Sequence, residues 1–188
     1  TDATTKSAID DSAWGMVGKN NFPTSFAANI TGPGIGATIS WEFDAGVGNT
    51  VGQPVVSADG DIYFGSANGS GKLIKLNKNG VKQWEYATNV SIGTPAVLSD
   101  EAVYFGRIGA GGSLAFTALN SDGSKRWDYD DASTVKAIAV SSKGEPHFTY
   151  QSGSQDKLAV LNADGSVKTL ISGTGLSNFS PVILENGT

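Results

Sequence analysis

The sequence predicts an all-β fold, a β-propeller of four-stranded antiparallel blades, from three observations. First, the triplets Trp41-Glu42-Phe43, Trp84-Glu85-Tyr86 and Trp127-Asp128-Tyr129 recur at a spacing of 43 residues, and a fixed period of this length is typical of repeat architectures. Second, segments rich in β-branched and aromatic residues alternate with clusters of Gly, Asn, Asp and Ser. Third, no helical periodicity of useful length is present. A lone meander of this size cannot bury both of its faces, whereas radial stacking of several copies buries them.

Each repeat is expected to form four short strands. In the first repeat we predict them at about residues 53–57, 61–66, 72–77 and 81–86. The first strand contains Pro54-Val55-Val56 and is apolar on both faces, as in a strand near the centre of a structure. In the fourth strand Trp84 and Tyr86 share one face and Glu85 lies on the other. The aromatic rings are therefore expected to fill the wedge between blades, where burying one Trp contributes a few kcal/mol at about 25 cal/mol per Å².

The turns before the fourth strands share a pattern that ends in glycine. The three copies are Leu76-Asn77-Lys78-Asn79-Gly80, Leu119-Asn120-Ser121-Asp122-Gly123 and Leu161-Asn162-Ala163-Asp164-Gly165. Glycine adopts positive φ at little cost, and Asn or Asp tolerates it while bonding its own backbone. Trp84 and Trp127 stand four residues after the first two glycines, and in the third repeat this position is taken by Thr169 or Leu170.

Together these motifs resemble the pyrroloquinoline-quinone-like β-propeller repeat. Gly60-Asp61-Ile62-Tyr63-Phe64-Gly65 and Ala102-Val103-Tyr104-Phe105-Gly106 are similar to the second strand of that repeat. Residues 12–20, followed by Gly32-Pro33, are similar to the leader that precedes the first blade in the family. The resemblance covers residues 12–188 and implies the propeller fold. It implies no single activity, because the family includes dehydrogenases, outer-membrane assembly lipoproteins and many surface proteins with no known activity.

The expected organisation is an N-terminal extension and family-like leader over residues 1–36 and a partial propeller over residues 37–188. Within the propeller we expect an outer strand at 37–43, three blades at 44–86, 87–129 and 130–171, and the start of a fourth blade at 172–188. The partial strands at both ends would leave open edges, and open edges invite pairing. Two explanations remain open: the chain is part of a longer propeller, or neighbouring chains complete each other's blades in a ring or filament.

Composition narrows the classes of function. The 188 residues include 25 glycines, 39% hydrophobic residues and only 16% charged residues, which is typical of a turn-rich globular domain. A net charge of −5 and a pI near 4.7 argue against nucleic acid and against an anionic membrane surface. No apolar run approaches the roughly 20 residues of a membrane helix, so we expect no membrane insertion. The absence of cysteine excludes disulfides and thiolate metal sites.

The sequence offers no catalytic set. The single histidine, His147, aligns with Tyr63 and Tyr104 and is expected to pack as a second-strand residue, and nothing pairs it with a nucleophile. The Asp-Gly stretches lack the spacing and the distal Glu of a calcium loop, and turn chemistry explains them. We therefore expect no catalytic residue, no metal and no cofactor. A quinoprotein dehydrogenase, which the resemblance raises, needs a larger ring, a calcium site and typically a vicinal disulfide, so only a fragment of such an enzyme remains an alternative.

Ligand binding is expected on the loops that join each outer strand to the next blade, together with the loops between second and third strands, because loops on a rigid scaffold carry function. The candidate ligand- or partner-binding residues there are Arg107, Asp130, Asp131, Lys136, Tyr150 and Gln151. Arg and Tyr are enriched at binding hot spots. The expected partner is another protein chain, or the remainder of the same propeller, at the open blade edges. An acidic, amide-rich surface with a few aromatics also suits carbohydrate.

Export is predicted from two features. Candidate N-glycosylation sequons occur at Asn29, Asn68, Asn89, Asn178 and Asn186. The sequence begins Thr-Asp-Ala-Thr-Thr without Met, so an upstream signal peptide or processing boundary is expected. The leading hypothesis is a non-enzymatic, exported or cell-surface propeller module that binds or scaffolds. The alternatives are a self-assembling extracellular structural protein whose blades are completed across chains, and a fragment of a quinoprotein dehydrogenase-like enzyme.

Overall fold

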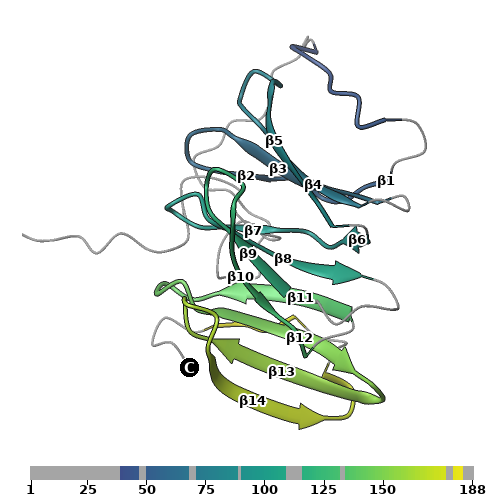
Figure 1. The fold of residues 1–188 in the computed structure, drawn as a ribbon, viewed down its shortest axis with the longest axis vertical. Helices are drawn as coiled ribbons and strands as arrows, with labels where there is room; N and C mark the ends of the chain where they lie inside the picture. The colour runs from purple at the N-terminus through teal and green to yellow at the C-terminus, as the bar shows by residue number, and fades with distance from the viewer. Residues whose placement is uncertain are drawn as a thin grey trace, which may run out of the picture.

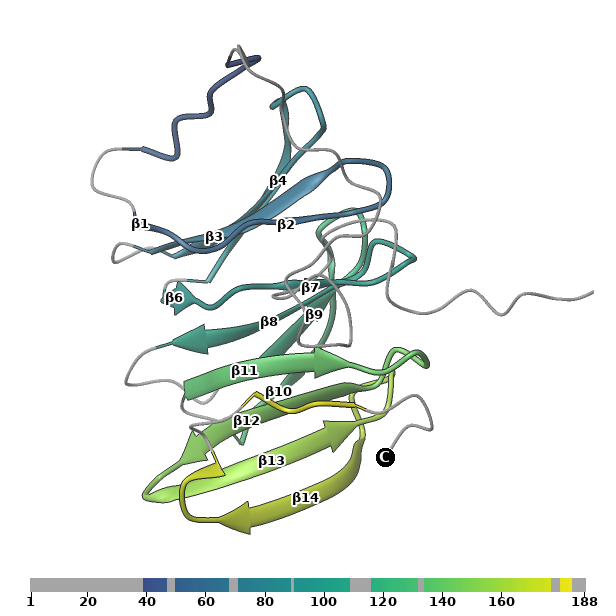
Figure 2. The ribbon, with the colours of Figure 1, turned by 180° about the vertical axis from the view of Figure 1, so that it is seen from behind.

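A computed structural model describes residues 39–46, 50–67, 71–88, 90–108, 116–131, 134–176 and 180–183. In these residues every regular element is a β-strand, and the strands form three antiparallel sheets that follow one another along the chain. Figure 1 shows the sheets stacked one above the other, from blue at the top to yellow-green at the bottom, and Figure 2 shows the same stack from behind. The predicted all-β fold is confirmed. The expected leader over residues 1–36 lies outside the described residues.

Each sheet is one blade, and its strands succeed one another from the inner to the outer side. Blade 1 contains β1 (Thr50–Val51), β2 (Val55–Val56), β3 (Ile62–Ala67), β4 (Lys72–Leu76) and β5 (Lys82–Ala87). Blade 2 contains β6 (Ser91–Ile92), β7 (Ala96–Val97), β8 (Val103–Ile108), β9 (Phe116–Leu119) and β10 (Lys125–Tyr129). Blade 3 contains β11 (Thr134–Val140), β12 (Pro146–Ser152), β13 (Gln155–Leu161) and β14 (Val167–Gly173).

Proline decides whether the inner strand of a blade is continuous. In blades 1 and 2 this strand is split in two around Pro54 and Pro95, because proline has no N–H to donate to the ladder. Gly93 N still donates to Gly106 O at 2.9 Å between β6 and β7. Blade 3 has Ile138 at the corresponding position, and β11 runs unbroken from Thr134 to Val140.

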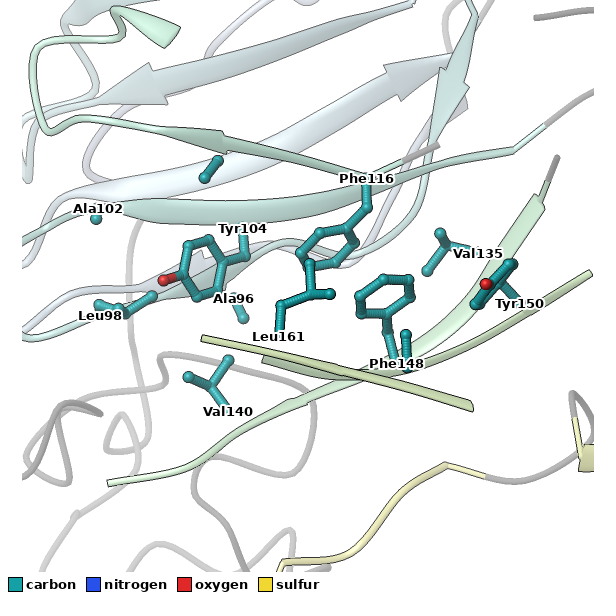
Figure 3. Packing of buried hydrophobic residues seen from close by; sticks show 12 residues of the cluster. Ala96, Leu98, Ala102, Tyr104, Phe116, Val135, Val140, Phe148, Tyr150 and Leu161 are labelled. Carbon is teal, nitrogen blue, oxygen red and sulfur yellow. The ribbon is translucent and has the colours of Figure 1, made fainter. Parts of the chain in front are cut away.

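The core lies between blades, as the alternation of apolar residues predicts. Between blades 2 and 3, the rings of Phe116 and Phe148 stack at 4.1 Å with an interplanar angle of 3°, and Tyr104 lies beside them. Figure 3 shows these rings meeting from the two blades, with Leu161 close to them. Each blade is therefore stable only against a neighbour, since one sheet alone would leave these faces in water.

The outer-strand tryptophans join each blade to the turn of the next. Trp84 Nε1 donates to Ser121 O at 2.9 Å, and Trp127 Nε1 donates to Ala163 O at 3.0 Å. The rings lie flat on the turn glycines: a Cβ built on Gly123 would fall 2.9 Å from Trp84 Cδ2. We call each Trp together with the turn it caps a tryptophan latch. The predicted wedge role of these aromatics is confirmed, and the glycine is required both for its φ of 84° and for the space above it.

Strand register settles which residue replaces tryptophan in blade 3. Trp84 pairs with Lys75, Trp127 pairs with Ala118, and Thr169 pairs with Val160 after the same irregularity in the ladder. The tryptophan position of blade 3 is therefore occupied by Thr169 and not by Leu170. A threonine has no ring to lay on a turn, so this side of blade 3 lacks a tryptophan latch.

Short segments cover the outer faces of the three-blade stack. Trp41 Nε1 donates to Lys78 O at 3.2 Å, and the Phe43 and Phe64 rings meet edge to face at 6.0 Å. The segment 39–46 thus covers blade 1 as an outer strand of a preceding blade would, although it pairs with no described strand. At the other end Ile183 is buried, whereas Val182 is 55% exposed.

Candidate functional site

The six residues predicted to bind a ligand gather at one end of blades 2 and 3. They lie near the end of β8, on the β10–β11 connection, at the start of β11 and at the end of β12. Antiparallel pairing brings the last two groups together, because Thr134 pairs with Gln151 and Val135 pairs with Tyr150. The expected clustering of these loops is therefore seen, and we call this part of the molecule the loop end.

Tyr150 is not a surface residue, and the prediction that it lies exposed on the loops is wrong. Its side chain is fully buried in the core between blades 2 and 3. Its hydroxyl donates to Asp131 Oδ2 at 2.9 Å and lies 3.0 Å from the Tyr129 hydroxyl. Burial, together with these two neighbours, holds the pKa of Tyr150 far above its usual value. Side chains alternate between the two faces of a strand. Near the end of β12, Tyr150 lies on the same face as Phe148, and this face packs against blade 2.

Asp131 is fully engaged in holding this corner together. Besides Tyr150, it accepts from Lys157 Nζ at 2.8 Å and from Ser152 Oγ at 3.3 Å. The Lys157 ammonium is the main cause that keeps the pKa of Asp131 below its usual range. A carboxylate with three protein donors has little capacity left for a ligand, so Asp131 serves to join the end of blade 2 to β12 and β13. Asp130 and Gln151 are both exposed at the same end.

Lys136 occupies a special position on the inner strand. The β11–β12 register shifts between Val135 and Ala137, so Lys136 is the extra residue of a β-bulge. The corresponding positions in blades 1 and 2 are Gly52 and Gly93, which carry no side chain. Lys136 is exposed and forms no ion pair with any described residue. The bulge therefore places one unpaired ammonium group where blades 1 and 2 have no side chain.

A cleft of about 210 Å³ lies beside Lys136, between the inner strands of blades 2 and 3. We call it the Lys136 cleft; its lining residues are Gly93, Thr94, Pro95, Ala96, Gly106, Val135, Lys136, Ala137, Ile138 and Ser180. The cleft opens where β6 and β7 separate around Gly93–Pro95. Gly106 lies directly against Val135, so there is no room for a side chain at position 106. The lining combines main chain, small apolar side chains and one cation, as in sites that hold a polar group of a ligand.

Arg107 lies between blades 1 and 2, at the loop end of β8. Its side chain is half-buried, and its Nε atom is buried without a hydrogen-bond partner among the described residues. It pairs through its backbone with Ile92, next to the Gly93 wall of the Lys136 cleft. Arg107 thus adds a second cation to the loop end, on the opposite side of blade 2 from Lys136.

His147 lies on β12, as expected, at the position of Tyr63 and Tyr104. Burial lowers the pKa of the imidazole, Lys168 lowers it further, and Glu145 opposes the shift. Its Nε2 is buried without a partner among the described residues. By contrast, Tyr104 Oη donates to Gly144 O of the next blade at 2.9 Å. In blade 2 the residue at this position therefore bonds the next blade, whereas in blade 3 His147 has no such bond among the described residues.

A buried ion cluster lies at the opposite end of the molecule, and no sequence motif predicts it. Lys75 Nζ lies 2.7 Å from Glu101 Oε2 and 3.0 Å from Asp61 Oδ2, and its side chain is only 8% exposed. Burial by itself lowers the pKa of Lys75, but the bonds to Glu101, Tyr63 and Asp61 outweigh it and raise the pKa. Glu101 adopts a φ of 58° where blades 1 and 3 have glycine. The only available signal was this replacement of a turn glycine by an acid.

A shallow hollow of about 320 Å³ lies at this opposite end, between blades 2 and 3. It is bordered by the ion pair of Arg126 and Asp100, whose Nη2 and Oδ2 atoms are 3.2 Å apart, and by Lys143. The Arg126 and Asp100 charges offset each other. Lys143 is exposed there and forms no ion pair with a described residue, but it lies in a turn, whereas Lys136 stands on a bulged inner strand, so we regard the hollow as the weaker candidate for recognition.

The described ranges contain no group of three or more His, Cys, Asp or Glu side chains placed to hold a metal ion. The same ranges contain no helix long and apolar enough to cross a membrane. All five sequon asparagines, Asn29, Asn68, Asn89, Asn178 and Asn186, lie outside the described residues.

Comparisons with known proteins support the fold. No protein-family model matches the chain, and no curated protein matches it. Among solved structures, the Dos1 propeller is similar with a TM-score of 0.60 and 14% identity, over 77% of this chain and 42% of that one. A protein of unknown function from Bacteroides caccae is similar with a TM-score of 0.52 and 17% identity, over 78% of this chain and 54% of that one. The chain thus spans about half the length of these two structures, and at these identities the likeness shows a propeller-like fold alone.

Proposed function

We propose that this chain is a non-catalytic binding or scaffold module of an exported, cell-surface protein, and that its ligand enters the Lys136 cleft. The observation that carries the proposal is the bulged lysine, which stands where the other two blades have glycine. β-Bulges re-aim side chains and are enriched beside functional sites. An exposed loop end on a rigid stack of blades is also where recognition residues are most often found.

The proposed ligand presents an anionic or carbonyl oxygen to Lys136. The ammonium has no carboxylate partner among the described residues, although the chain as a whole has a net charge of −5. A carboxylate entering the cleft would gain a charge-assisted hydrogen bond without breaking an existing ion pair. Asp131 and Tyr150 support the site indirectly, because their mutual bond ties Asp131 to β12, the strand that pairs with β11. Acidic peptide segments and acidic sugars both carry the required group.

An NMR titration of the full chain tests this proposal. Hexaglutamate should shift the amide resonances of Lys136 and Thr94, whereas hexalysine and a neutral hexasaccharide should leave them in place. Lys136→Gln should abolish the shifts. The matched control is Lys78→Gln, which removes an exposed lysine at the opposite end, and it should have no effect. Equal responses of the two variants, or no response to hexaglutamate in the wild type, would refute the role of the cleft.

A second candidate function is assembly of blades across chains, or with the remainder of a longer propeller. It is favoured by Val182, which is 55% exposed, whereas the corresponding Val55 and Ala96 are 0% and 2% exposed because the next blade packs against them. Adding a fourth blade in trans as a separate polypeptide of the same repeat should protect the Val182 amide from hydrogen exchange. Unchanged exchange at a saturating concentration of that polypeptide would remove this candidate.

A further inference from the structure

The outer strand of blade 3 differs from the other two in the chemistry of one pair of positions. In blades 1 and 2 these positions hold an ion pair with an exposed lysine: Lys82 with Glu85 at 2.9 Å, and Lys125 with the largely buried Asp128 at 2.7 Å. Register assigns the same two positions in blade 3 to Val167 and Leu170, because Val167 pairs with Leu161 as Lys125 pairs with Leu119. Val167 is 52% exposed and Leu170 is 45% exposed. Blade 3 therefore has two half-exposed apolar side chains where blades 1 and 2 have a salt bridge.

The open side of blade 3 does not explain these exposed residues. Leu170 pairs with Ala159, and Ala159 belongs to the core cluster that packs against blade 2. Leu170 therefore faces blade 2 and not the side on which a fourth blade would lie. Val167 pairs with Leu161, which belongs to the same cluster. The two apolar side chains stand at the outer rim of a blade interface that is already complete.

The strand that carries them is also an unprotected edge. β14 is the last strand of its sheet, no described strand pairs with its outer edge, and all seven of its residues are exposed. Charged side chains normally keep such edges from pairing with other chains. β14 has one charged residue, Lys168, and its ammonium is held by Glu145 at 2.6 Å. Lys157, which corresponds to the Lys72 that binds Glu85 in blade 1, is likewise held by Asp131.

We propose that β14 is a homodimerisation edge, at which the β14 strands of two copies of this chain pair antiparallel across a two-fold axis. Main-chain hydrogen bonds would join the two blades into one continuous sheet, and Val167 and Leu170 of each copy would be buried against the other. This interface uses neither the Lys136 cleft nor the open side of blade 3. It is therefore independent of the function proposed above.

Charge favours a second copy as the occupant. When Leu170 faces Leu170 across the axis, Lys168 lies opposite Ser172 and Thr169 lies opposite Ile171, so no like charges meet. The same pairing through β5 or β10 would remove exposed charged side chains from water. A strand rich in Val, Thr, Leu and Ile with its one charge neutralised is thus complementary to itself.

Sedimentation velocity of the full chain over a range of concentrations tests the proposal. The wild type should show a monomer–dimer equilibrium. The double variant Val167→Lys with Leu170→Glu rebuilds the ion pair of blades 1 and 2, so it should fold normally. It should raise the dimer dissociation constant at least about tenfold, because four half-exposed apolar side chains are no longer buried.

The control variant Val182→Lys alters an equally exposed apolar residue on the open side of blade 3 and should leave the dimer unchanged. A wild type that stays monomeric at every concentration would overturn the proposal. So would a dimer that survives the double variant, or one that is lost in the control as well. Circular dichroism establishes that each variant is folded.

A cross-link locates the interface directly, because the chain has no cysteine. A short bis-maleimide should link two copies of the Leu170→Cys variant. It should not link copies of Val81→Cys, since Val81 is 57% exposed on blade 1, away from β14. Failure to link Leu170→Cys, or equal linking of both variants, would contradict pairing through β14.

Discussion

The tryptophan latch predicts that the turn glycine beneath each ring tolerates no side chain. In Gly123→Ala the new Cβ would lie 2.9 Å from Trp84 Cδ2 and 3.0 Å from Cγ, whereas carbon atoms in contact are normally separated by about 3.5–4.0 Å. The ring cannot withdraw freely, because Trp84 Nε1 is bonded to Ser121 O. The residue would also have to keep a φ of 84°. Positive φ costs about 1 kcal/mol and overpacking about 1–3 kcal/mol, so we expect a loss of roughly 3 kcal/mol in the free energy of unfolding.

The chain offers a matched control for this substitution. Gly153 has a φ of 60°, and nothing lies within 4 Å of a Cβ built there. Gly153→Ala therefore carries only the backbone cost of about 1 kcal/mol. Both variants are compared by urea denaturation of the full chain, monitored by tryptophan fluorescence and by circular dichroism. The difference between them isolates the contact with the ring.

A double-mutant cycle separates the clash from other causes. In a Trp84→Leu background the ring is gone, so Gly123→Ala should cost about the same as Gly153→Ala. Equal costs of the two glycine substitutions in the wild-type background would refute the packing argument. A cost at Gly123 that persists after the tryptophan is removed would show that backbone strain alone is responsible.

Three further outcomes follow from the charged groups. Glu101→Gly should lower the free energy of unfolding by about 1–3 kcal/mol in urea, although it relieves a positive φ, because the buried Lys75 ammonium loses one of its two carboxylate partners. Asp131→Asn should lower the melting temperature at pH 7, and the difference from the wild type should shrink as the pH falls below about 3.9. The folded pKa of Asp131 is depressed, so its contribution is present above the unfolded pKa of about 3.9 and is lost as pH falls through the folded value. His147→Tyr should flatten the pH dependence of stability between pH 7 and pH 5. Burial lowers the folded pKa of His147, so the wild type loses stability as pH falls below the unfolded pKa of about 6.5, and melting curves at both pH values measure the difference.

The sequence predicted the strands and the wedge tryptophans because both are local or periodic. β5 and β10 were found from their triplets, and the turn that ends in Gly123 was found from its Asn-Ser-Asp-Gly composition. Prediction failed where the direction of a side chain depends on a neighbouring blade. Its place near a loop predicts Tyr150 in solvent, yet its position on β12 directs the side chain into the core between blades 2 and 3. Lys136 lies at the loop end as predicted, but its bulge depends on how β11 pairs with β12, and no local sequence pattern predicts that pairing.

What the sequence determined by itself is the repeating unit: a period of 43 residues, four strands per repeat, and an aromatic residue on the outer strand. These features follow from side-chain alternation and turn chemistry, which act within a few residues. Only the tertiary structure decided which groups are free. Asp131 and Lys157 neutralise each other, Lys136 has no partner in the described part of the chain, and Thr169 rather than Leu170 takes the place of tryptophan. Such outcomes depend on contacts between residues far apart in sequence, so they exist only once the blades have packed.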